Sequence, residues 1–221
     1  MTTIAIIGAG PGLGAATARR FGQQGFAVAL ISRTQNTLDH LAAELTEHGI
    51  TARGYAADVQ DRSQLTAALE QAGTELGPIE VLQYSPVPRK DFLRPVLETT
   101  ADDLAAATEF SILGPLTAVT QVLPGMRQLG HGTILFVNGS SAATPNGDVA
   151  GTSIAFAGES AYGAMLHEAL TPHNIRVGQL IIPGAIGGAD PLYDPEALAN
   201  RLWNIHAEPG PFRTTVGTDS T

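Results

Sequence analysis

The stretch Ile4-Ala5-Ile6-Ile7-Gly8-Ala9-Gly10-Pro11-Gly12-Leu13-Gly14, near the amino terminus, decides the fold. Its first four residues form a continuous apolar run, which is typical of a strand buried on both faces. The glycines that follow allow a tight turn and a close approach of the backbone to a pyrophosphate. Residues 15–24 then predict a helix whose amino terminus attracts phosphate groups. This context predicts a dinucleotide site, with a purely structural turn as the alternative; the predicted binding residues are Gly8, Gly10, Pro11, Gly12, Leu13 and Gly14.

Strand and helix patterns alternate along the rest of the chain. Such alternation requires parallel strands joined by right-handed crossovers. The sequence therefore predicts an α/β protein with a three-layer Rossmann fold: one domain over residues 1–221, with a mainly parallel sheet of six or seven strands and helices on both faces. The predicted strands are 4–7, 26–31, 51–57, 79–83, 132–137, 175–182 and 212–216; the predicted helices are 15–24, 37–48, 63–76, 101–129, 153–170 and 194–206. Gly114-Pro115 and Pro124-Gly125 predict a kink in the long helix.

The composition excludes several classes of protein. Hydrophobic residues make up 43% and charged residues 15% of the chain, which is typical of a globular protein. The net charge of -9 argues against binding to nucleic acid or to anionic membranes. The absence of cysteine excludes disulfides and thiolate chemistry, and the six histidines show no metal-ligand spacing, so no metal is expected. Without a signal peptide or a membrane-spanning run, we expect a cytoplasmic protein.

The end of the second predicted strand indicates which dinucleotide binds. An acidic residue there would bind the ribose 2′-hydroxyl, whereas this chain has Ser32 followed by Arg33. A guanidinium group pairs with a phosphate, so the sequence favours NADP(H) over NAD(H). The alternative is a solvated surface arginine. Asp58, at the end of the third strand, is predicted to bind the adenine amino group or to cap the helix that starts near Asp61.

Taken together, these parts resemble the short-chain dehydrogenase/reductase family. The family's T-G-x-x-x-G-x-G motif is matched from Gly8 to Gly14, and Asp58-Val59 matches its adenine contact. Residues 175–177, followed by Pro183-Gly184, resemble the strand and turn that cover the nicotinamide. The family's Asn-Asn-Ala-Gly stretch appears as residues 84–87. Besides the glycine turn, the resemblance implies these cofactor-binding residues: Ser32, Arg33, Asp58, Val59, Ser85, Pro183 and Gly184.

The catalytic half of the family pattern is replaced. Residues 170–177 resemble the family's L-A-P-x-G-I-R-V, and counting back from them puts the tyrosine of Tyr-x-x-x-Lys on Thr152 and its lysine on Phe156. Threonine is a far weaker acid than tyrosine, and phenylalanine carries neither charge nor donor. The family serine falls near Gly139, or on Ser140 or Ser141, and the family asparagine falls on Ser111. The candidate catalytic residues are Ser140, Ser141, Thr152 and, as a replacement acid, Tyr84; Tyr162 is interpreted as a packing residue and His167-Glu168 as an exposed helix face.

Two functions are consistent with this pattern. The first is an NADP(H)-dependent oxidoreductase that transfers hydride to or from an unknown small carbonyl or alcohol by non-standard proton chemistry. The second is a non-catalytic dinucleotide-binding sensor or partner subunit. The resemblance also implies a homodimer or homotetramer, packed through the small-residue helix around residues 155–164.

Overall fold

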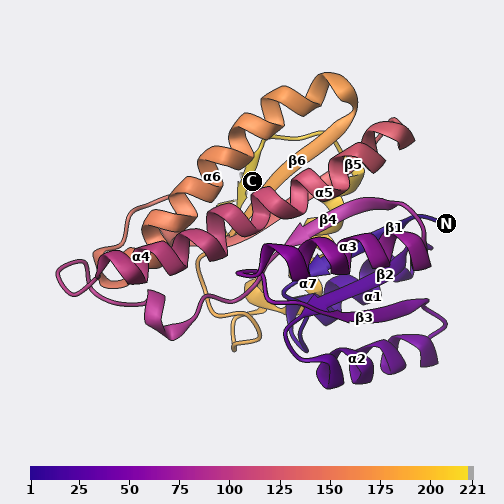
Figure 1. Cartoon of the computed structure of the whole chain (residues 1–221), viewed down its shortest axis with the longest axis horizontal. Coiled ribbons are helices and arrows are strands. Elements are labelled where there is room, and N and C mark those ends of the chain that lie inside the picture. Colours follow the sequence, from indigo (N-terminus) through magenta and orange to yellow (C-terminus); the bar gives the residue numbers. More distant parts are fainter. Residues whose placement is uncertain (219–221) are drawn as a thin grey trace.

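The computed structural model describes residues 1–218, which form one parallel sheet between two layers of helices (Figure 1). Residues 219–221, the last three of the predicted domain, lie outside the described part. The sheet has seven strands in the order β3-β2-β1-β4-β5-β6-β7, and every paired neighbour is parallel. This confirms the predicted α/β fold. The strands are β1 (Thr3–Ile7), β2 (Ala27–Ser32), β3 (Ala52–Ala56), β4 (Ile79–Tyr84), β5 (Gly132–Gly139), β6 (Ile175–Ile182) and β7 (Arg213–Thr215).

The helices occupy the intervals that the sequence predicts, with boundaries shifted by a few residues. They are α1 (Leu13–Gly22), α2 (Gln35–Glu47), α3 (Arg62–Leu76), α4 (Ala101–Thr108), α5 (Gly114–Leu129), α6 (Ala150–Leu170) and α7 (Pro195–Ala207). Short helical turns are η1 (Lys90–Phe92), η2 (Glu109–Leu113), η3 (Ser140–Ala142), η4 (Gly147–Val149), η5 (Thr171–His173) and η6 (Pro191–Tyr193).

The two faces of the sheet carry separate hydrophobic cores. One core lies under α3, α5 and α6, and the other lies under α1, α2 and α7. Successive side chains of a strand point to opposite faces. Ala5 and Ile7 therefore join the first core, while Ile4 and Ile6 join the second. Burial on both faces explains the continuous apolar run of β1.

The predicted helix 101–129 is divided into α4, a π-helical turn η2, and α5. The predicted kink is therefore present, and it lies just before Gly114-Pro115. The hydroxyl of Tyr84 donates a hydrogen bond to the carbonyl of Phe110 within η2, and a Cβ at position 114 would collide with that hydroxyl. Pro115 stands in the first turn of α5, where a missing N–H costs little. Pro124 lies inside α5 without ending it.

The sheet order identifies where a ligand binds in such a fold. β1 lies between β2 and β4, so the chain builds outward from β1 in one direction and then returns to build in the other. In open parallel sheets, ligands bind beyond the carboxyl ends of the strands at this point of reversal. The segments that follow β1 and β4 are therefore the expected centre of the site.

None of the helices in residues 1–218 combines the length and the apolar character needed to cross a membrane.

Candidate active site

The turn after β1 lies directly against the segment after β4. Gly8 has a φ of +92°, and a Cβ at this position would lie 2.6 Å from the Cα of Pro86. Only glycine accepts both the positive φ and this close approach. The first glycine of the motif therefore joins the ends of the two central strands.

The other glycines of the turn have different roles. A Cβ at Gly14 would lie 3.0 Å from the Cα of Ala9, so this glycine lets α1 pack closely against the turn. A Cβ at Gly10 or Gly12 would meet nothing within 4 Å, so the backbone at both positions faces open space. Pro11 between them is exposed.

Within residues 1–218, no side chain caps the backbone N–H groups at the amino terminus of α1. Its N-cap residue, Gly12, makes no side-chain cap, and the first turn contains no acidic residue. The first backbone N–H groups of a helix and the positive end of its dipole bind anions. Leu13, the first helical residue, is buried and anchors the turn from below. The uncapped N–H groups and the open space at Gly10 and Gly12 therefore fit a pyrophosphate.

The residues expected to distinguish NADP(H) from NAD(H) lie at the carboxyl end of β2. Ser32 is the last residue of this strand and is partly buried, and Arg33 is exposed. Within residues 1–218, no ion pair or hydrogen bond engages the Arg33 side chain. Its guanidinium is therefore available to a phosphate group.

The structure separates the two roles predicted for Asp58. Its carboxylate accepts a hydrogen bond from the backbone N–H of Gln60 at 3.0 Å and does not cap α3. The cap is Asp61, which accepts from the backbone N–H groups of Ser63 and Gln64. The capping alternative for Asp58 is wrong because the N-cap position of α3 lies three residues later, at Asp61. The adjacent Val59 is buried.

Ser85 follows β4 and the Pro183-Gly184 turn follows β6, with β5 between these two strands of the same half-sheet. The Ser85 hydroxyl donates to the carbonyl of Ile7 at 3.2 Å, so it links the ends of β1 and β4. Pro183 is exposed just after β6. A Cβ at Gly184 would collide with the ring of Tyr193, so this turn requires glycine for the approach of η6.

The structure does not support Tyr84 as a replacement acid. Its side chain is 1% exposed, and its hydroxyl is bonded to the Phe110 carbonyl inside the fold. Burial, followed by the charges of Glu159 and Asp58, raises the pKa of Tyr84 well above its ordinary value. A phenol in this position packs η2 against β4 and does not face a substrate.

The two positions predicted to correspond to the family's tyrosine and lysine carry no exposed proton donor. Thr152 is buried, and its hydroxyl points to the carbonyl of Phe92 at 3.4 Å, the limit for a hydrogen bond. Phe156 is buried against Ala142 and Ile181. The side chain at the lysine position therefore completes an apolar cluster. Ser111, at the family's asparagine position, is buried within η2.

The serine candidates follow the end of β5. Gly139 is the last residue of that strand, and Ser140 and Ser141 open the turn η3. Ser140 is exposed, whereas Ser141 is buried. They lie two strands from β1 in the sheet, at the same carboxyl edge. Of the four catalytic candidates, Ser140 is the one exposed to solvent.

Two helical side chains test the remaining predictions. Tyr162 packs edge-on against Phe136 with ring centroids 6.4 Å apart, as predicted, and burial raises the pKa of Tyr162 to about 12. His167 differs from the prediction of an exposed face: it is partly buried, and its Nδ1 lies 2.8 Å from the carbonyl of Val177. Glu168 is exposed as predicted.

Sequence analysis missed a group of buried polar side chains beneath α6. The available signal was polar residues at inward positions of elements that are otherwise apolar, such as Gln179 within β6. The members of the group are Asn138, Glu159, Ser160 and Gln179.

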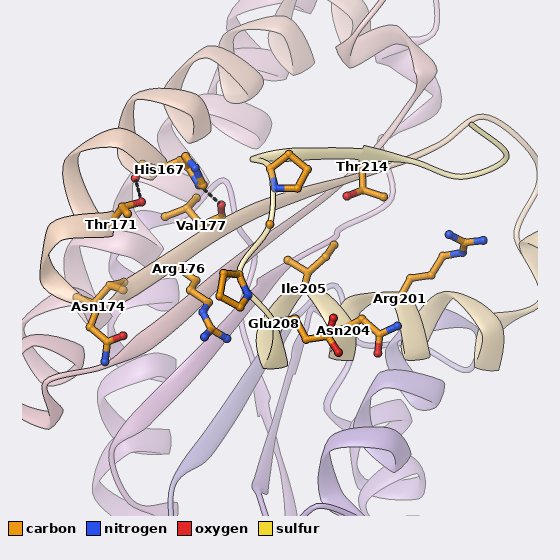
Figure 2. Close-up of a pocket in the computed structure, with 14 residues that line it drawn as sticks. His167, Thr171, Asn174, Arg176, Val177, Arg201, Asn204, Ile205, Glu208 and Thr214 are labelled. Atoms are coloured by element: carbon orange, nitrogen blue, oxygen red, sulfur yellow. Dashed lines mark hydrogen bonds between the residues drawn. The ribbon is translucent and has the colours of Figure 1, made fainter. Parts of the chain in front are cut away.

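A cavity of about 460 Å³ lies at the opposite, amino-terminal edge of the sheet (Figure 2). It is lined by the ends of α6 and α7 and by the starts of β6 and β7. Arg176 donates to the carbonyl of His206 there, and Thr171 donates to the carbonyl of His167 at 2.6 Å. Because it is at the other end of the strands, this cavity is separate from the glycine turn.

Within residues 1–218, no three His, Asp or Glu side chains gather in a way that could hold a metal ion.

Comparison with known proteins identifies the family. A model described as short chain dehydrogenase matches residues 2–190. The short-chain reductase protein NovJ of Streptomyces niveus is 33% identical over 199 residues, which is 89% of this chain and 72% of that protein. A short-chain dehydrogenase from Rhodopseudomonas palustris is 26% identical and covers 97% of each chain, with a TM-score of 0.86. The chain therefore belongs to the short-chain dehydrogenase family of oxidoreductases.

A more distant structure shares the fold alone. It is the NADPH-bound form of a short chain oxidoreductase from Pseudomonas aeruginosa PAO1, described as containing an atypical catalytic center. It is 19% identical, covers 100% of this chain and 97% of that chain, and has a TM-score of 0.85.

Proposed function

We propose that this protein is an NADP(H)-dependent oxidoreductase that transfers hydride to or from a small carbonyl or alcohol. The observation that carries the proposal is the meeting of two features at the reversal point of the sheet. An uncapped helix amino terminus follows β1, and an unpaired arginine follows the neighbouring β2. Together they suit a pyrophosphate and a ribose 2′-phosphate.

The adenosine half of the cofactor fits the residues present. In this proposal the glycine turn binds the pyrophosphate and Ser32 and Arg33 bind the 2′-phosphate. Asp58 and Val59 then border the adenine. Ser85 and the Pro183-Gly184 turn lie on the nicotinamide side.

The nicotinamide half meets a changed surface. Phe156 supplies an apolar ring where the family has the lysine that holds the ribose hydroxyls, so we expect weaker binding of that half. The bound reduced cofactor supplies a hydride. The chain's own contribution is the exposed hydroxyl of Ser140, which we propose donates a hydrogen bond to the substrate oxygen. Neither Thr152 nor Tyr84 presents a proton to that position.

The non-catalytic alternative keeps one supporting observation, the burial of Phe156 and Thr152 at the family's catalytic positions. Family membership favours the oxidoreductase. Turnover separates the two: consumption of NADPH with a panel of small aldehydes, ketones and imines supports the enzyme, and binding without consumption supports the sensor or partner subunit.

The test of the cofactor proposal is a fluorescence titration of the protein with NADPH and with NADH. We expect tighter binding of NADPH, and we expect Arg33→Ala to remove that preference while leaving NADH binding nearly unchanged. Arg127→Ala is the matched control, because Arg127 is exposed near the end of α5, which leads to the opposite edge of the sheet. Equal affinity of the unaltered protein for both cofactors would contradict the choice of NADP(H).

We further propose that the protein forms a homodimer or homotetramer through α6. The outward face of this helix is apolar: Ile154 is 50% exposed and Met165 is 62% exposed, with the small Ala157 and Ala161 between them. An exposed apolar stripe on a helix with small residues allows two copies to pack closely.

A further inference from the structure

A chain of polar side chains crosses the sheet beneath α6 and ends at β5. Arg213, on the edge strand β7, donates through Nε to Oε1 of Gln179 at 2.9 Å. Ser160 on α6 donates to the same oxygen at 2.9 Å and accepts from Arg213. The Gln179 amide then donates to Oδ1 of Asn138 at 2.8 Å. Ser160, Gln179 and Asn138 are all buried.

The donors in this chain share one direction. Because two donors occupy Oε1 of Gln179, its amide nitrogen faces Asn138. Asn138 accepts through its oxygen, so its own amide nitrogen faces away from Gln179. This leaves the Asn138 amide nitrogen on the side of the Glu159 carboxyl of α6.

The carboxyl that this amide faces belongs to Glu159, one turn after Phe156 on α6. The side chain of Glu159 is 1% exposed. Burial raises the pKa of Glu159 well above its ordinary value, and the Asn138 amide lowers it by a smaller amount. The two groups are close, but they do not form a hydrogen bond of good geometry, because Nδ2 of Asn138 and Oε1 of Glu159 both have no bonded partner.

Two unpaired polar atoms side by side in a core are unfavourable for folding. Each gives up its hydrogen bonds to water on folding without gaining a partner in the protein. Glu159 occupies an inward position of α6, where an apolar residue would pack without this cost. Buried polar atoms without a hydrogen-bond partner are rare in folded proteins, and this pair therefore suggests a functional role.

Asn138 connects this pair to the proposed site. It is the next-to-last residue of β5, and Gly139 and the two serines of η3 follow it directly. A change in the position of Asn138 therefore moves the turn that carries Ser140 and Ser141. Phe156, at the family's lysine position, lies one helical turn before Glu159 on the same buried face of α6.

We propose that Glu159 is a positioning residue, which orients the Asn138 side chain and thereby keeps the Ser140–Ser141 turn in the arrangement that accepts the nicotinamide half of the cofactor. This inference rests on the proposed binding of a dinucleotide. When Glu159 ionises, an uncompensated charge appears in the core, the Asn138 amide turns fully toward it, and the strand end shifts. Cofactor affinity then decreases.

The surroundings of Glu159 do not supply a compensating cation. The titratable or charged side chains on α6 and on the described elements around it are Tyr84 on β4, Lys90 and Asp91 on η1, Asp102 and Asp103 on α4, Glu109 on η2, Asp148 on η4, Tyr162, His167 and Glu168 on α6, His173 on η5, Arg176 on β6 and Arg213 on β7. Lys90 is exposed, and Arg176 donates to the carbonyl of His206. Arg213 is committed to Gln179 and Ser160. Asp103 and Glu109 are paired with arginines of their own.

The experiment is an NADPH titration of the whole protein at increasing pH, with Glu159→Gln as the variant. Glutamine has the same shape and stays neutral. We expect the unaltered protein to lose affinity as the pH rises through the pKa of Glu159, by about tenfold for each further pH unit. The variant cannot ionise at this position, so it should show no such loss. Glu168→Gln, on the exposed face of the same helix, is the matched control and should behave like the unaltered protein.

The outcomes separate the two proposals. If the unaltered protein does not bind NADPH at any pH, the proposed function fails. If it binds NADPH but Glu159→Gln leaves the pH profile unchanged, the positioning role alone is overturned.

A second measurement keeps the inference testable if the variant does not fold. In unaltered protein labelled with carbon-13 at the glutamate carboxyls, nuclear magnetic resonance should show one glutamate that stays protonated at neutral pH. Finding every glutamate ionised at that pH would overturn the proposal.

Discussion

Each glycine of the turn after β1 meets a different physical requirement. Gly8 needs a positive φ and contact with the backbone of Pro86, whereas Gly10 faces open space. A sequence motif presents these glycines as equivalent, and only their surroundings show that the first is structural and the second is available to a ligand. At the residue scale, this difference makes stability and binding separable.

Gly8→Ala should lower the free energy of unfolding by roughly 2 kcal/mol or more, because alanine disfavours the positive φ and its methyl group would overlap Pro86. Gly10→Ala is the control, and its stability should stay within about 1 kcal/mol of the unaltered protein. It should nevertheless weaken NADPH binding, since its methyl group occupies the space proposed for the pyrophosphate. Chemical denaturation and a cofactor titration measure the two effects. A stable Gly8→Ala protein would contradict the close contact between the two strand ends.

Helix boundaries depend on short-range hydrogen bonds at the element scale. Asp194 caps α7 by accepting from the backbone N–H groups of Glu196 and Ala197, at 3.0 Å and 3.2 Å. Pro195 occupies the first helical position, where its fixed φ suits the helix. Such local signals made this helix predictable from sequence. The π-helical turn η2 was not predictable in the same way, because it is bonded to Tyr84 on a distant strand.

Asp194→Ala should lower the free energy of unfolding by about 1 kcal/mol through loss of this cap. Asp194→Asn keeps an acceptor oxygen at the same place and should remain close to the unaltered protein. Thermal or chemical unfolding of the two variants checks the difference. Equal destabilisation by both substitutions would show that the charge of Asp194, and not its capping oxygen, stabilises α7.

At the scale of the whole molecule, the buried carboxyl of Glu159 couples stability to pH. An unfolded glutamate releases its proton near pH 4.3, whereas burial holds the pKa of folded Glu159 well above that value. The folded state therefore binds a proton that the unfolded state has released. Stability is greatest below the unfolded pKa and decreases as the pH rises toward the folded pKa.

The expected slope is a loss of at most about 1.4 kcal/mol in the free energy of unfolding per pH unit. Glu159→Gln should reduce that slope. Urea unfolding above neutral pH is the measurement, because burial lowers the pKa of His206 and makes that residue destabilising only as the pH falls. The same slope in both proteins would mean that Glu159 is ionised in the folded state.

Assembly is also a property of the whole molecule. Met165→Glu on the outward face of α6 should shift the protein toward the monomer in analytical ultracentrifugation, because it places charge in the proposed apolar contact. Val87→Glu is the control: Val87 is 85% exposed and lies outside α6, in the segment after β4. A monomeric unaltered protein would contradict the proposed oligomer.

The sequence by itself determined the fold class and the glycine turn, and it predicts the replacement of the family's tyrosine and lysine. These features depend on local patterns. Apolar runs, helical spacing and the order of motifs can be recognised in the sequence without information on distant contacts. β6 was predicted to the residue, and it lies between Asn174 and Pro183.

Only the tertiary structure decided which candidate side chains face the site. Tyr84 and Thr152 are buried by elements far away in the chain, and Asp58 loses the capping role to Asp61. The Glu159–Asn138 pair exists because α6 packs over the end of β5, and no sequence spacing encodes that contact. Side-chain burial depends on how layers pack, so it is decided by the assembled sheet and helices and not by any single element.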